Sequence, residues 1–111
     1  MRRRNLVAVA LIVTTAIVAY GRIIDNGFAW DDGYLVLDNP AIQDLSNVPK
    51  LFVQPWAAGT SYGLGARQNA PYFRPVALAS MALDWSIAGP DPVVFHGMNL
   101  LLHIMSALLL W

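Results

Sequence analysis

The feature that most constrains this chain is the apolar stretch at residues 6–24. It contains no charged residue from Leu6 to Tyr20, and Arg22 lies close to its far end. In an α-helix, about 19 residues extend roughly 28 Å at ~1.5 Å per residue, which is enough to cross the hydrocarbon core of a bilayer. We therefore predict a first transmembrane helix at residues 6–24.

A second apolar stretch, residues 92–111, contains no Asp, Glu, Lys or Arg after position 92 and is also long enough to span. Hydrophobic residues make up 57% of the chain and charged residues 13%, whereas soluble proteins average roughly 25% charged. These features predict an all-α membrane protein in which two transmembrane helices flank a long loop. Because the second stretch ends without a polar flank, we expect the chain to be truncated.

The basic residues indicate an orientation. Residues 1–5 contain Arg2, Arg3 and Arg4, and the positive-inside rule places such a segment in the cytoplasm. Residues 25–91 are then extracytoplasmic, in a bacterial inner membrane or an equivalent bilayer.

The alternative is a signal peptide cleaved after residue 21, which would leave a secreted or lipid-anchored fragment. A bulky Tyr20 close to Arg22-Ile23-Ile24 is a poor cleavage context, so a retained anchor is favoured.

Residues 25–71 form a loop that is longer than a simple connector needs, and long ordered loops are usually functional. Turn and helix-start signals at Asn39-Pro40 and Asn47-Val48-Pro49 predict short interfacial helices at 41–45 and 49–53. Residues 59–68 are rich in glycine and read as a flexible loop. Residues 72–91 predict an interfacial amphipathic helix that starts near Pro75, followed by a Gly-Pro-Asp-Pro break.

Charge and cysteine content exclude some classes of function. The net charge is zero, so no global field favours nucleic acid, and we predict no nucleic-acid partner. The chain has no cysteine and therefore neither a disulfide framework nor a thiolate metal site.

The adjacent carboxylates Asp31 and Asp32 are the first candidate for chemistry. Like charges side by side raise one another's pKa unless a cation or hydrogen-bond donors neutralise them. The pair is suited to a general base, to ligands of a divalent cation, or to an anchor for a hydroxyl-bearing substrate. The alternative is a solvated Asp-Asp-Gly turn.

Arg74 is the second candidate, in the sequence Tyr72-Phe73-Arg74-Pro75. A guanidinium held between aromatic residues at the start of a helix suits a phosphate, because it donates two parallel hydrogen bonds. The alternative is an ordinary interfacial arginine within an aromatic belt.

His96, Asn99 and His103 are the third candidate, because spacings of three and four place them on one stripe of the last helix. Polar residues inside a span usually face protein or a cavity. The stripe could bind a lipid phosphate, contact a partner helix, or supply His96 or His103 as an axial ligand of a haem or chlorin. The two histidines are separated by ~10 Å along the helix and cannot clamp one metal between them.

The order and spacing of these blocks resemble the start of the GT-C-type membrane glycosyltransferases. The similarity is greatest to the protein O-mannosyltransferase-like, TMTC-like group, which often carries tetratricopeptide repeats. Four ordered blocks carry the resemblance across essentially the whole chain: residues 28–42 with the Asp pair, Leu51-Phe52 with Pro55-Trp56, Tyr72-Phe73-Arg74-Pro75-Val76, and a final block with Leu83-Asp84, Gly89, His96, Asn99 and His103.

The resemblance implies an extracytoplasmic enzyme that uses a lipid-linked sugar donor, with polyprenyl phosphate as the leaving group and a Ser or Thr hydroxyl as the acceptor. By position, Asp31 would be the base or acceptor-orienting group and Asp32 its support, with or without a divalent cation. The substrate or the phosphate of the lipid-linked donor would be bound by Arg74, His96, Asn99 and His103, and the protein would be in contact with membrane lipid. Members of the group have many spans, so the 111-residue chain alone would be inactive, whereas the full-length protein would be a GT-C enzyme.

The alternative function is a small non-catalytic transmembrane subunit of a larger membrane complex. Such a subunit would pack on its protein partners through the His96, Asn99 and His103 stripe and through the aromatic loop.

Overall fold

The computed structural model describes residues 3–60 and 72–111, and within these ranges every regular element is helical. The chain forms two compact units, one built from the residues up to Gly27 with Pro92–Trp111 and the other from Phe28–Asp91. Two of its helices are long and apolar enough to cross a membrane. The predicted fold class, an all-α membrane protein, is confirmed. The domain boundaries and the orientation in the bilayer stay predictions.

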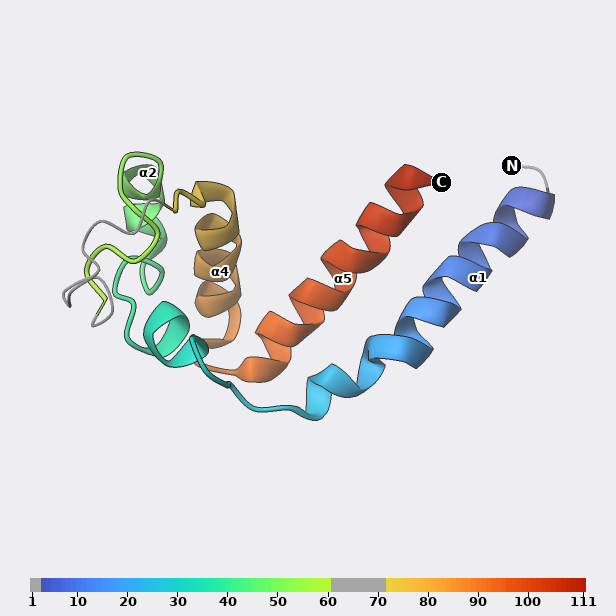
Figure 1. The fold of residues 1–111 in the computed structure, drawn as a ribbon, viewed down its shortest axis with the longest axis horizontal. Coiled ribbons are helices and arrows are strands. Elements are labelled where there is room, and N and C mark those ends of the chain that lie inside the picture. The colour runs from blue at the N-terminus through green and yellow to red at the C-terminus, as the bar shows by residue number, and fades with distance from the viewer. Residues whose placement is uncertain (1–2, 61–71) are drawn as a thin grey trace. The chain divides into compact units, whose positions relative to one another are not determined.

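The first unit consists of two long helices joined to a short one. Helix α1 (Arg3–Tyr20) continues into the 3-10 helix η1 (Gly21–Asp25), and both pack against α5 (Pro92–Leu110) (Figure 1). Ala16 of α1 and Phe95 of α5 are buried, whereas most of the other apolar side chains of these helices are exposed or half-buried. A helix that is apolar all round and not covered by protein suits a lipid environment.

The second unit is built from short helical segments and one longer helix. The π-helical turn η2 (Gly33–Leu37) is followed by the 3-10 helix η3 (Leu45–Asn47), which runs directly into α2 (Val48–Leu51). In place of the short helix predicted at 41–45 the structure has a turn around residues 40–42, whereas the short helix predicted at 49–53 is found at Val48–Leu51 and continues η3. Most of the predicted glycine-rich loop at 59–68 lies outside the described residues, as do residues 61–71 of the predicted extracytoplasmic loop.

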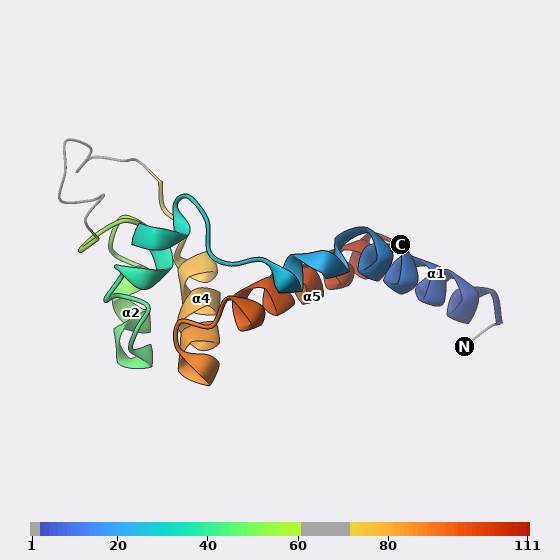
Figure 2. The ribbon, with the colours of Figure 1, turned by 90° about the horizontal axis from the view of Figure 1, so that it is seen from below.

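Helix α4 (Pro75–Ala88) packs against α2 and η3, and the two views show α2 and α4 side by side (Figure 2). It begins at Pro75, as predicted, because proline in the first turn removes an N–H that has no helical partner. It ends at Ala88. The Gly89 N–H donates to the Trp85 carbonyl at 2.7 Å, and the positive φ of 64° at Gly89, which glycine adopts without strain, then turns the chain out of the helix.

The exposed side of α4 is apolar. Leu78 and Ala82 are buried, whereas Val76, Leu83 and Ile87 are exposed, and these three belong to the apolar face that the sequence predicts. An exposed apolar face of this kind is compatible with a lipid interface, and the interfacial position of α4 stays a prediction.

Asn39 is the polar centre of the second unit. Its side chain is fully buried, and its amide donates from Nδ2 to the Leu35 carbonyl at 2.9 Å. Its Oδ1 accepts from the Ala41 backbone N–H at 3.1 Å, which turns the chain at Pro40 and competes with a helix there. The buried hydrophobic residues of this unit are Val36, Ile42, Leu51, Ala57, Leu78 and Ala82.

Candidate functional site

The Asp pair lies at the start of η2, and its two carboxylates have different surroundings. The Asp32 Oδ2 accepts a hydrogen bond from the Ala29 backbone N–H at 2.9 Å. The Asp32 N–H donates in turn to the Ala29 carbonyl at 3.1 Å, so the two bonds close a turn over residues 29–32. Asp32 is half-buried and acts as an internal tether of this turn.

Asp31 occupies the outer side of the same turn. Its backbone carbonyl accepts from the Tyr34 and Leu35 N–H groups at 3.2 and 2.8 Å, and so starts the helical turn. Its side chain is exposed, and within residues 3–60 and 72–111 its carboxylate makes no hydrogen bond or ion pair. Of the two predicted carboxylates, Asp31 is therefore the one that is accessible to a substrate.

Trp30, directly before the pair, is a residue whose setting sequence reasoning missed. Its φ of 52° places it in the left-handed region, where L-residues with a bulky side chain are strained, and its side chain is 97% exposed. An exposed indole next to an exposed carboxylate is available to an aromatic-binding or sugar-binding contact. The adjacent aromatic and acidic residues were visible in the sequence, but no residue pattern signals the left-handed backbone at Trp30.

Arg74 lies directly before α4 and faces two aromatic rings. Its guanidinium carbon is 5.6 Å from the centroid of the Tyr72 ring and 5.9 Å from that of Trp56. The Trp56 and Tyr72 rings meet edge to face at 6.0 Å, and the Trp56 backbone N–H donates to the Tyr72 backbone carbonyl at 3.1 Å. The cation–π contacts hold the guanidinium in place while its N–H donors remain available to an anion.

Tyr34 connects the Asp pair to Arg74. Its ring lies 6.4 Å from the Trp56 ring in an edge-to-face arrangement, and its backbone N–H is bonded to Asp31. The three rings of Tyr34, Trp56 and Tyr72, which we call the aromatic cluster, thus tie η2 to the residue before α4. The sequence predicted an arginine held between aromatic residues in the segment Tyr72-Phe73-Arg74-Pro75. In the structure the two rings beside the guanidinium are those of Tyr72 and Trp56.

The remaining predicted site residues belong to the other unit. Asn99 and His103 line a cavity of about 220 Å³ together with Tyr20, and the rings of Tyr20 and His103 meet edge to face at 4.9 Å. His96 is half-buried on the same helix. The structure therefore brings Asn99 and His103 together beside α1 and η1. The six predicted residues are divided between the two units: Asp31, Asp32 and Arg74 in one, His96, Asn99 and His103 in the other.

A bound metal or haem would need ligands from among these residues. In the part of the chain that the structure describes, no three His, Asp or Glu side chains are grouped as metal ligands. Because the Asp32 carboxylate also holds the Ala29 N–H, the pair would need further ligands from elsewhere to bind a divalent cation. The prediction of a haem or chlorin at His96 or His103 stays a prediction.

Asp84 belongs to the final block of the resemblance, but the sequence did not single it out as a site residue. It lies on α4, is only 3% exposed, and its Oδ1 is buried without a hydrogen-bond partner among the described residues. Burial raises the pKa of its carboxyl to about 6, because a charged carboxylate is poorly solvated there.

Comparison with known proteins shows similarity to two curated relatives. The chain is 26% identical over 107 residues to the protein O-mannosyl-transferase TMTC1 of Homo sapiens, and 27% identical over 107 residues to that of Mus musculus. Each alignment covers 93% of this chain but only 12% and 11% of the relatives, so the chain spans about an eighth of their length. No family profile matches the chain, and no solved structure is significantly similar to it. The resemblance to part of a TMTC-like membrane glycosyltransferase is confirmed.

Proposed function

We propose that this TMTC-like chain is part of an extracytoplasmic membrane glycosyltransferase that moves a sugar from a polyprenyl-phosphate donor to a hydroxyl acceptor. The names of the two relatives describe O-mannosyl transfer to protein, which supports mannose as the sugar and a Ser or Thr side chain as the acceptor. The N-terminus is then cytoplasmic and residues 25–91 face the extracytoplasmic side of a bacterial inner membrane or its equivalent.

The observation that carries the proposal is the difference between the two carboxylates. Asp32 is engaged with the Ala29 N–H, whereas the exposed Asp31 carboxylate can accept a proton. In the proposed reaction Asp31 takes the proton of the acceptor hydroxyl, and the hydroxyl oxygen forms a bond to the anomeric carbon of the sugar. The bond from that carbon to the phosphate oxygen breaks, and polyprenyl phosphate leaves with the electron pair.

Arg74 is proposed to stabilise the departing phosphate. A planar guanidinium donates two parallel hydrogen bonds to phosphate oxygens, and its contacts with Trp56 and Tyr72 keep the charge in one place. His96, Asn99 and His103 are proposed to contact the lipid-linked donor from the membrane unit, where α1 and α5 meet membrane lipid. Because two spans form only a small part of such an enzyme, the 111-residue segment is expected to be inactive by itself.

The test is Asp31→Asn in the complete protein that contains this sequence. Removing a general base typically costs 10²–10⁴-fold in rate, so we expect sugar transfer to fall by at least about 100-fold. The matched control is Asp25→Asn, which neutralises another exposed carboxylate in the same segment and should leave transfer unchanged. Membrane insertion and thermal stability should be the same in both variants. Wild-type transfer by Asp31→Asn would remove Asp31 from the reaction.

A non-catalytic subunit is the second proposed function, and the exposed polar residues of α5 favour it. Asn99 and His103 are both exposed on an otherwise apolar helix, where a partner helix could bind them. In that case His103→Leu should release the chain from a purified membrane complex, while Asp31→Asn should leave the complex and its activity unchanged. The transferase proposal predicts the opposite pattern.

A further inference from the structure

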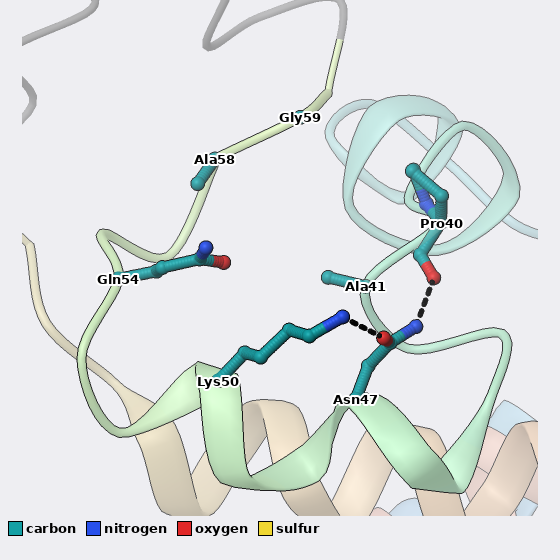
Figure 3. Close-up of a pocket in the computed structure, with 7 residues that line it drawn as sticks. All are labelled: Pro40, Ala41, Asn47, Lys50, Gln54, Ala58 and Gly59. Carbon is teal, nitrogen blue, oxygen red and sulfur yellow. Dashed lines mark hydrogen bonds between the residues drawn. The ribbon is translucent and has the colours of Figure 1, made fainter.

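The second unit contains a pocket whose lining suits a ligand site that is independent of the proposed glycosyl transfer. It has a volume of about 310 Å³, which is at the lower end of the size of small-ligand sites. Its walls come from the turn at Pro40, from the helical run η3–α2, and from the segment that follows α2 (Figure 3). Six of the residues that line it are Pro40, Ala41, Asn47, Lys50, Gln54 and Ala58.

The cationic wall of the pocket is held in a defined position. The Asn47 amide donates from Nδ2 to the Pro40 carbonyl at 3.3 Å and accepts on Oδ1 from Lys50 Nζ at 2.9 Å. One end of this amide is thus anchored to the turn at Pro40 and the other accepts from the lysine head, as the dashed lines in Figure 3 show. An ammonium group carries three donors, so Lys50 keeps donors for a ligand.

The segment after α2 forms another wall of the pocket and presents a neutral donor. The buried Thr60 hydroxyl donates to the Ala57 carbonyl at 2.8 Å, which secures the chain beside Ala58. The Gln54 amide extends from the other side of the pocket (Figure 3), and it has no partner within the described part of the chain. Lys50 and Gln54 thus offer N–H donors from two sides.

The charge of the pocket is positive. None of its lining residues is acidic. The nearby Asp44 accepts a hydrogen bond from the Ser46 backbone N–H at 2.8 Å, and the hydrogen bonds from Ser46 are the main reason that the pKa of Asp44 lies below its ordinary value, with a smaller effect of Lys50. Asp44 is therefore directed to the start of η3, and in residues 3–60 and 72–111 no carboxylate forms an ion pair with Lys50.

We propose that this pocket binds an oxyanion, a phosphate or a carboxylate, between Lys50 Nζ and the Gln54 amide. The ammonium supplies the charge, and the amide adds a donor from another wall, as in charge-assisted anion sites. The alanine and proline side chains leave room for a small group rather than for a lipid chain.

The sequence makes the test direct, because Lys50 is the only lysine in the chain. Lysine labelled with ¹³C and ¹⁵N places a single side-chain NMR signal in the pocket. The 111-residue chain is reconstituted in zwitterionic phosphatidylcholine nanodiscs and titrated with sodium phosphate, sodium acetate or sodium chloride at equal ionic strength. We expect the Lys50 signal to shift and saturate in the millimolar range with at least one of the two oxyanions, but not with chloride.

Variants distinguish the pocket from general ion effects. Gln54→Ala should weaken binding about fivefold, as expected for the loss of one hydrogen bond to a charged group, while keeping the Lys50 signal. The matched control is Gln43→Ala, an exposed glutamine outside the pocket, which should leave the titration unchanged. Saturation with phosphate alone assigns a phosphate ligand, and saturation with acetate alone assigns a carboxylate. Shifts equal to those with chloride, or no effect of Gln54→Ala, would overturn the proposal.

Discussion

The backbone N–H of Ala29 lies 2.9 Å from the Asp32 carboxylate, and the Asp32 N–H lies 3.1 Å from the Ala29 carbonyl oxygen. This reciprocal pair closes the turn from which Trp30 and Asp31 extend into solvent. Two acids that are adjacent and chemically identical in the sequence therefore take different roles. One holds the backbone and the other is exposed.

The first prediction tests the tether. Asp32→Ala removes the acceptor of the Ala29 N–H and should destabilise the turn by about 1 kcal/mol. Asp32→Asn keeps an amide oxygen that can accept the same bond, so the turn should remain. Hydrogen exchange of the Ala29 amide measures the difference directly: it should become faster in Asp32→Ala and stay slow in Asp32→Asn. Equal exchange in both variants would contradict the role of Asp32.

The second prediction concerns Asn39. Asn39→Ala leaves the Ala41 N–H and the Leu35 carbonyl without their buried partner and should lower the free energy of unfolding by about 2–3 kcal/mol. Gln43→Ala is the control, because Gln43 is exposed and its bond to the Leu37 carbonyl can be replaced by water. Denaturant unfolding of the chain in detergent provides the measurement. Similar losses in the two variants would show that burial of Asn39 contributes little.

The third prediction follows from the ring contacts of Arg74. Arg74→Lys keeps the positive charge but loses the planar donor pair and the stacking on Trp56 and Tyr72. In the complete enzyme we expect the KM for the lipid-linked donor to rise about tenfold, equivalent to ~1.4 kcal/mol. Arg22→Lys, at an exposed arginine of η1, is the control. A wild-type KM in Arg74→Lys would mean that charge alone is sufficient.

The fourth prediction is a dependence of stability on pH from Asp84. Burial raises the pKa of this carboxyl from 3.8 to about 6, so between these pH values the folded chain binds more protons than the unfolded chain. The free energy of unfolding should therefore fall as the pH rises from about 4 to about 6, and stay lower above that range. Asp84→Asn should abolish this dependence and stabilise the chain at pH 7.5 by about 1–2 kcal/mol.

Melting temperatures measured from pH 4 to pH 8 test the Asp84 prediction. Asp25→Asn, which changes an exposed carboxylate, should keep the wild-type pH profile. The assignment to Asp84 would be wrong if wild type and Asp84→Asn gave parallel profiles.

The helical membrane architecture could be predicted from the sequence because hydropathy adds up over long segments. Each apolar stretch is long enough that single residues do not change the conclusion. The start of α4 could also be predicted from the sequence, because proline favours the first turn of a helix through its own fixed φ and missing N–H.

The internal arrangement of the loop could not be predicted in the same way, because it depends on contacts between distant residues. The sequence places Phe73 beside Arg74, yet the second ring is Trp56, which reaches Arg74 only through the fold. The full burial of Asn39 and the left-handed backbone of Trp30 also result from packing and hydrogen bonds that no local pattern encodes. The residue types of the candidate site were visible in the sequence, but their division of roles was not.

The aromatic cluster has a consequence for biogenesis. Tyr34, Trp56 and Tyr72 meet although long segments of chain separate them, so the cluster cannot close until Tyr72 has been synthesised and has left the ribosome. A nascent chain arrested before that residue has the first apolar helix but lacks the ring that completes the contacts of Arg74. The segment between the two apolar helices therefore completes its fold late, only after nearly all of it has been synthesised.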